Sequence, residues 1–128
     1  MKPDVSPELK PIVYIVDDDA SVRKSLMRLM VSVKFEARSF ASANEFLDSG
    51  FRDQNACLIA DVKMPGLTGL ELHQKIIDLG YDLPVIFITG YDTEQTREQA
   101  KKSGALGYFS KPIDDQALLD TINWALSR

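Results

Sequence analysis

Three runs of apolar residues constrain the fold of this chain more than any other feature of its sequence. Residues 12–16, 57–60 and 85–88 are apolar with no alternating polar position. Neighbouring side chains of a β-strand point to opposite faces of the sheet, so an unbroken apolar run predicts a strand that is covered on both faces. Such strands are typical of parallel sheets between two layers of helices. The runs therefore predict an α/β fold.

The segments after the first two runs have a helical period. Apolar residues recur at helical spacing in residues 20–33 and again in residues 70–79, as expected for helices that lie on a sheet. Thr68 and Glu71 match a capping box at the start of the second of these helices, and Gly80 suits its end. Strand and helix thus follow one another along the chain.

Weaker signals extend the alternation. Residues 35–40 mix charged with apolar side chains, which indicates an edge strand. Ser42 and Glu45 match a second capping box, ahead of a short helix that Gly50 would end. Residues 105–110 predict a short fifth strand.

Two further helices complete the pattern. Residues 93–103 predict a helix that is polar nearly all round, with Ala100 as its only strongly apolar residue, so we expect weak packing and mobility. A last helix begins near Asp114. Five alternations of strand and helix predict a doubly wound parallel sheet with helices on both faces, and right-handed crossovers leave few topologies.

Composition sets the domain count. A chain of 128 residues, 45% apolar and 27% charged, fits one globular domain with its own core. Residues 1–10 contain Pro3 and Pro7 among charged side chains and predict a flexible tail. We therefore expect one domain over residues 11–128, with Pro11 opening its first strand.

Charge and cysteine content exclude several functional classes. The net charge of -4 argues against direct nucleic-acid binding, which requires a basic face. No apolar stretch reaches the roughly 18 residues that span a membrane, and the N-terminus lacks a signal-peptide core. The single cysteine, Cys57, lies in an apolar run and predicts a small core residue, not a reactive thiol. We expect a cytoplasmic protein.

Polar residues follow the predicted strands at the points where the strands end. They are Asp17 and Asp18 after the first strand, Asp61 after the third, Thr89 after the fourth and Lys111 after the fifth. In a parallel sheet these ends lie along one edge, where open α/β sheets bind ligands. Three carboxylates there would repel one another unless a cation intervened. Oxygen ligands of this kind favour Mg²⁺ or a similar divalent ion.

The same residues suggest a reaction. A carboxylate such as Asp61 can attack a phosphoryl group and become an aspartyl phosphate. A metal ion and the Lys111 ammonium would neutralise charge on the transferred oxygens, and Thr89 could donate a hydrogen bond to one of them.

Other polar residues have simpler interpretations. Asp19 is expected to form a turn or cap a helix, and His73 to lie on a solvated helix face. Arg23 is placed on the solvent side of the first helix. Tyr108, taken alone, is more often a core residue than a switch.

Five short motifs together resemble the receiver domain of bacterial two-component response regulators, over residues 12–126. The motifs are Val-Asp-Asp-Asp at 16–19, Asp-Val-Lys-Met-Pro-Gly at 61–66, Ile-Thr-Gly at 88–90, Gly-Ala-Leu-Gly-Tyr at 104–108 and Lys-Pro at 111–112. Residues 40–47 and 84–90 are most similar to FixJ-like regulators, whose receivers usually precede a LuxR-type helix-turn-helix. The chain is then either a stand-alone receiver or the amino-terminal part of a longer regulator.

The resemblance implies a flavodoxin-like (βα)5 fold with strand order 2-1-3-4-5 and a role for each site residue. Asp61 would be the phosphoacceptor. Mg²⁺ or Mn²⁺ would be held by three carboxylates and one backbone carbonyl, those of Asp17, Asp18, Asp61 and Lys63. Thr89 would follow the phosphoryl group, Lys111 would pair with it, and Tyr108 would be the switch aromatic. Lys111–Pro112 would be a cis peptide.

The resemblance also implies partners. A sensor histidine kinase would donate the phosphoryl group, and the helix over residues 93–103, the fifth strand and the last helix would change their surface. That surface would bind a second copy of the domain, an output domain or both. The protein would be a signalling phosphoacceptor that assists its own phosphorylation and dephosphorylation, not an enzyme. No direct contact with nucleic acid or membrane is expected.

Two positions depart from the family pattern, and three other functional classes stay open. Lys34 stands where glycine is common, so the turn is expected to differ, and Ala60 replaces a larger aliphatic residue. A flavin or nucleotide binder would use the same sheet edge but normally has a glycine-rich phosphate loop. An aspartyl-nucleophile phosphohydrolase normally has an acid where this chain has Lys63. A receiver fold that works without phosphorylation is the third.

Overall fold

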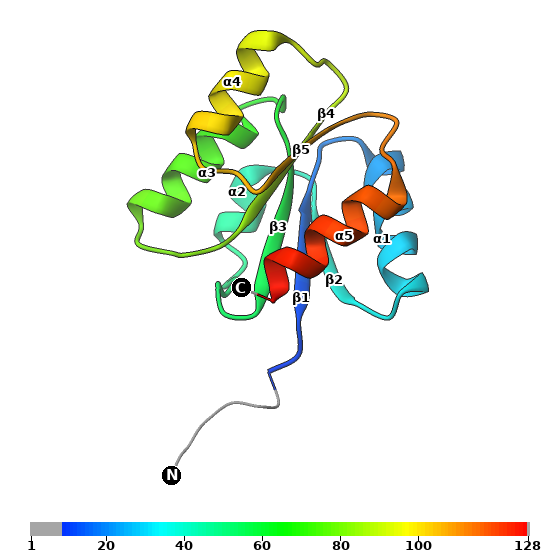
Figure 1. The fold of residues 1–128 in the computed structure, drawn as a ribbon. Helices are drawn as coiled ribbons and strands as arrows, with labels where there is room; N and C mark the ends of the chain where they lie inside the picture. Colours follow the sequence, from blue (N-terminus) through cyan, green and yellow to red (C-terminus); the bar gives the residue numbers. More distant parts are fainter. Residues whose placement is uncertain (1–8, 128) are drawn as a thin grey trace.

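The computed structural model describes residues 9–127 of the chain. All but two residues of the expected tail over residues 1–10 lie outside the described part. Ten elements alternate along the chain (Figure 1). They are β1 Ile12–Val16, α1 Ala20–Ser32, β2 Glu36–Phe40, α2 Ala43–Leu47, β3 Ala56–Asp61, α3 Gly69–Asp78, β4 Val85–Thr89, α4 Glu94–Lys102, β5 Gly107–Ser110 and α5 Asp115–Leu126.

The five strands form one parallel sheet in the order β2-β1-β3-β4-β5, which confirms the predicted fold class and strand order. Every residue of β1, β3 and β4 is buried, as their unbroken apolar runs predict. β2 lies at an edge and exposes most of its residues. In the sheet register Val16 pairs with Ala60, and Asp61 pairs with Ile88, so the carboxyl ends of the central strands are level.

Helices cover both faces of the sheet (Figure 1). Alternate side chains of β1 divide between two apolar layers: Val13 and Ile15 pack with residues of α1 and α5, while Tyr14 and Val16 pack with residues of α2 and α3. Cys57 is fully buried in the first layer, where burial raises the pKa of its thiol to about 12. This confirms Cys57 as a core residue.

Side chains cap the helices largely where the sequence predicts. Asp19 caps α1 by accepting a hydrogen bond from the Ser21 backbone N–H. Both halves of the capping box form at Thr68 and Glu71. At α2, Ser42 caps the helix, but Glu45 accepts from the Ala41 N–H, one residue before the predicted partner. Gly50 also lies beyond α2, which ends at Leu47 with Asp48 as its C-cap residue.

The turn after α1 has the usual conformation although Lys34 replaces glycine. The Phe35 N–H donates to the Met30 carbonyl and the Lys34 N–H to the Val31 carbonyl, a Schellman motif with Lys34 at φ 65°. Gly80 ends α3 in the same way at φ 90°. The expected change in the turn is therefore absent, and lysine adopts a backbone conformation that favours glycine.

No helix within residues 9–127 combines the length and the apolar character that crossing a lipid bilayer requires.

Candidate functional site

Three carboxylates meet at the carboxyl edge of the sheet. Asp17 and Asp18 follow β1, and Asp61 is the last residue of β3. One oxygen from each of the three lies within 4.8 Å of the others. Asp17 and Asp61 are buried, whereas Asp18 is exposed. The strand-end positions in the sequence thus predict the acidic cluster that the structure shows.

Lys111 is the cation paired with this cluster. Its Nζ lies 2.9 Å from Asp17 Oδ2 and 3.7 Å from Asp61 Oδ2. Burial lowers the pKa of Lys111, but its hydrogen bond to Asp17 and the nearby carboxylate charges outweigh this effect and raise it. Burial, followed by the negative charge of Asp17, raises the pKa of Asp61 to about 6. One ammonium therefore does not balance the three carboxylates.

The surplus of negative charge on hard oxygen ligands fits a small divalent cation. Mg²⁺ and Mn²⁺ prefer carboxylate and carbonyl oxygens, and Mg²⁺ is usually held by one or two carboxylates with water and a phosphate oxygen. Asp18 is exposed and Asp17 and Asp61 are buried, so the cluster has one side open to solvent. Its chemistry and its access both suit such an ion.

Two residues outside the predicted set fix the backbone around the acids. Arg23 of α1 donates from Nη1 to the Asp17 carbonyl oxygen at 2.7 Å, so the prediction that it faces solvent is wrong. Gly69, the first residue of α3, packs on Asp61: a Cβ at this position would lie 2.2 Å from the Asp61 carbonyl oxygen. A glycine at a helix start, where better helix formers are usual, was the available sequence signal. No periodicity could have revealed the Arg23 contact.

Thr89 and Lys63 flank the acids. Thr89 is buried at the end of β4, and its hydroxyl oxygen accepts a hydrogen bond from the Tyr91 N–H at 3.0 Å. The Lys63 N–H lies 3.4 Å from Asp61 Oδ1. The Lys63 ammonium lies 4.8 Å from the centre of the Tyr91 ring, which places these two side chains together at the rim of the site.

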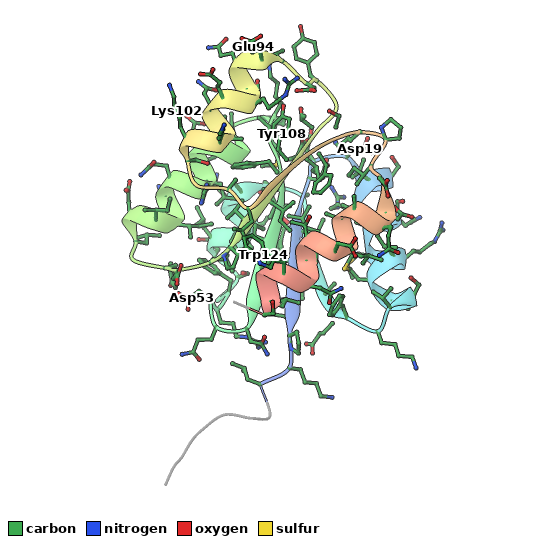
Figure 2. All side chains as sticks on the ribbon, viewed as in Figure 1. Asp19, Asp53, Glu94, Lys102, Tyr108 and Trp124 are labelled. Carbon is green, nitrogen blue, oxygen red and sulfur yellow. The ribbon has the colours of Figure 1, made fainter. Side chains whose placement is uncertain are left out.

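Tyr108 lies on β5, two positions before Ser110 at the strand's end. Its hydroxyl donates to Asp92 Oδ1 at 2.9 Å. Figure 2 shows Tyr108 and Asp19 toward the same end of the molecule, the end at which the strands terminate, whereas Asp53 lies at the opposite end. The peptide bond between Lys111 and Pro112 is cis, as the family resemblance implies.

His73 does not lie on a solvated face, so this prediction is wrong. Only 5% of the residue is exposed. Its Nδ1 is 3.2 Å from Ser103 Oγ at the end of α4, and its ring packs at 5.7 Å against the Phe87 ring. Burial lowers the pKa of the imidazole. His73 is buried because the end of α4 packs over α3 at this point. The spacing of apolar residues in α3 gives no information about that neighbouring helix.

A doubly wound sheet has acids, a hydroxyl and a lysine at its carboxyl edge, and comparison with known proteins shows the family to which this arrangement belongs. The family model of the response regulator receiver domain matches residues 13–123. The chain belongs to this family.

Individual relatives support the assignment. The chain is 43% identical to Nodulation protein W of Bradyrhizobium diazoefficiens, over 93% of this chain and 52% of that protein. It is 42% identical to the transcriptional regulatory protein TdiR of Thauera aromatica, over 90% of this chain and 51% of that protein. The crystal structure of FixJ-N superposes with a TM-score of 0.84 at 33% identity, covering 93% of this chain and 95% of that one.

These comparisons confirm the resemblance to FixJ-like receivers that the sequence motifs indicate. The chain spans about half the length of the curated relatives it matches.

Proposed function

We propose that the chain is the phosphoacceptor of a two-component phosphorelay and that Asp61 receives the phosphoryl group. The observation that supports this most is the meeting of Asp17, Asp18 and Asp61 with Lys111 at one sheet edge, in a chain of the receiver family. We infer that a sensor histidine kinase is the donor.

Each residue has a task in the transfer. An Asp61 carboxylate oxygen attacks phosphorus, the bond from phosphorus to the donor breaks, and an acyl phosphate forms. Asp17, Asp18, Asp61 and the Lys63 carbonyl would hold Mg²⁺ or Mn²⁺, which would neutralise charge on the transferred oxygens. Lys111 moves from its pair with Asp17 toward the new phosphoryl oxygens, since it already lies 3.7 Å from Asp61.

The change of surface follows from the new charge. A phosphoryl group on Asp61 accepts a hydrogen bond from the Thr89 hydroxyl, which gives up its bond from the Tyr91 N–H. Tyr108 changes position with Thr89, and α4, β5 and α5 present a different face. By linkage, a second copy of the domain or an output domain that prefers this face stabilises the phosphorylated form.

The test is the intact mass of the protein after incubation with acetyl phosphate and Mg²⁺. We expect one added phosphate, lost on treatment with hydroxylamine because an acyl phosphate is cleaved by this nucleophile. The adduct should be absent in Asp61→Ala and after chelation of the metal.

A matched control is Asp120→Asn, which removes an exposed acid of α5 away from the cluster and should accept phosphate as the wild type does. No adduct on wild-type protein under any of these conditions would contradict the proposal and favour a receiver that works without phosphorylation.

A further inference from the structure

We propose that the carboxylate of Asp92 holds Tyr108 in the position of the unphosphorylated state and thereby sets how readily the domain switches. This inference rests on the proposed role of Tyr108 as the switch residue. It adds a positioning residue that contacts neither the acids nor the phosphoryl group.

The geometry joins three elements at one carboxylate. Asp92 Oδ1 accepts from the Tyr108 hydroxyl at 2.9 Å, and Asp92 Oδ2 accepts from Ser110 Oγ at 3.1 Å. Arg97 of α4 donates to Oδ2 at 3.0 Å. We call these four residues the Asp92 cluster. Asp92 itself lies between β4 and α4, so the cluster ties this connection to β5 and to the first turns of α4.

Asp92 lies on the short connection that follows the other expected switch residue, Thr89. Thr89 ends β4, and its hydroxyl oxygen accepts from the Tyr91 N–H, next to Asp92 in the chain. Movement of Thr89 toward Asp61 breaks this bond and displaces the backbone that positions the Asp92 carboxylate. The bonds of both switch residues are therefore made by adjacent residues of one connection and can be lost together.

The surroundings allow this movement. α4 buries only Thr96 and Ala100, so packing restrains it weakly. A hollow of about 250 Å³ lies between α4 and β5 and is lined by Arg97, Ala100, Lys101, Ala105, Gly107 and Tyr108. Since Tyr108 borders this hollow, its ring has space on one side once the hydroxyl is released.

The charge of Asp92 strengthens the restraint. Hydrogen bonds from Arg97 and from Tyr108 lower the pKa of Asp92, so the carboxylate is ionised at neutral pH. Burial and the bond to Asp92 raise the pKa of Tyr108 to about 12, so the phenol keeps the proton that it donates. A hydrogen bond to an ionised acceptor is stronger than one between neutral groups. Loss of this bond should favour the switched state.

The experiment measures how tightly each variant binds beryllium fluoride with Mg²⁺, a phosphoryl mimic that needs no transfer step. If Asp92 stabilises the unswitched state, Asp92→Ala binds the mimic about fivefold more tightly than wild type, a typical coupling between two sites. Asp92→Asn keeps the shape of the side chain and should change affinity in the same direction by less. Thermal unfolding of each variant checks that it is folded.

A double-mutant cycle separates this role from simple loop support. Tyr108→Phe removes the donor, so adding Asp92→Ala to it should leave the affinity unchanged. Ser110→Ala removes another donor to the same carboxylate but spares the Tyr108 bond, and should change the affinity for the mimic less than Asp92→Ala does. In the unphosphorylated protein, NMR signals of the Tyr108 ring should shift more in Asp92→Ala than in Ser110→Ala.

The outcomes are distinct. Unchanged or weaker binding in Asp92→Ala, with a wild type that binds the mimic, would overturn this inference alone. An equal effect of Asp92→Ala with and without the Tyr108 hydroxyl would also overturn it. Wild-type protein that neither binds the mimic nor takes up phosphate would overturn the proposed function with it.

Discussion

At the scale of single residues, the left-handed backbone conformation of Lys34 can be tested by replacing this lysine with glycine. Lys34 has φ 65° at the end of α1, where Gly80 and Gly104 occupy the equivalent positions after α3 and α4. A side chain in the left-handed region costs roughly 1–2 kcal/mol relative to glycine.

We therefore expect Lys34→Gly to raise the free energy of unfolding by up to about 1 kcal/mol, after the entropy of the more flexible unfolded chain is subtracted. Urea titration followed by circular dichroism should show a higher midpoint with an unchanged slope. The reciprocal control, Gly80→Ala, has open space for its Cβ and should lower the midpoint through conformation alone. An unchanged or lower midpoint in Lys34→Gly would contradict the assigned turn.

At the scale of elements, the start of α3 is positioned by contact with the backbone of the phosphoacceptor. A Cβ on Gly69 would lie 2.2 Å from the Asp61 carbonyl oxygen, and the Gly69 N–H donates to the Val62 carbonyl. The connection between β3 and α3, which includes Lys63, depends on this close approach.

Gly69→Ala must therefore displace α3 or the end of β3, and we expect a loss of about 3 kcal/mol in stability. Because the displacement reaches Asp61, uptake of phosphate from acetyl phosphate should fall as well. Gly90→Ala is the matched control, since its Cβ would meet only Lys111 Cδ, at 3.7 Å. If thermal unfolding showed Gly69→Ala to be as stable as Gly90→Ala, the close approach of Gly69 to the Asp61 carbonyl oxygen would be contradicted.

At the scale of the whole molecule, the ionised carboxylate of Asp61 opposes folding in the absence of a divalent cation. Burial and Asp17 raise the pKa of Asp61 to about 6. The pKa of Asp61 is about 4 in the unfolded chain, so the folded protein loses stability as the pH rises from about 4 to about 6. Above the folded-state pKa the full loss is present.

At about pH 8 without divalent cations, Asp61→Asn should have a Tm about 5 °C above that of wild type, because a charge that is buried and is repelled by Asp17 is removed. Millimolar Mg²⁺ should raise the Tm of wild type and have a smaller effect on Asp61→Asn. Differential scanning calorimetry measures both. A destabilised Asp61→Asn variant would show that Lys111 balances the cluster by itself.

The sequence alone predicted the fold and the members of the acidic cluster. Unbroken apolar runs identify buried parallel strands, and in a parallel sheet a residue that ends a strand must lie at one known edge. For this reason Asp17, Asp18, Asp61 and Lys111 could be assigned to one site before any coordinate was known, and they meet there.

Only the tertiary structure decided which side chains contact one another across elements. The bond from Tyr108 to Asp92, the burial of His73 beneath α4 and the reach of Arg23 to the Asp17 carbonyl depend on how helices pack on the sheet. Strand and helix periods report which face of an element is apolar, but they hold no information on the distance between two faces. The sequence therefore determined which residues lie at the carboxyl edge of the sheet. The packing of helices on the sheet determined the contacts that restrain Tyr108.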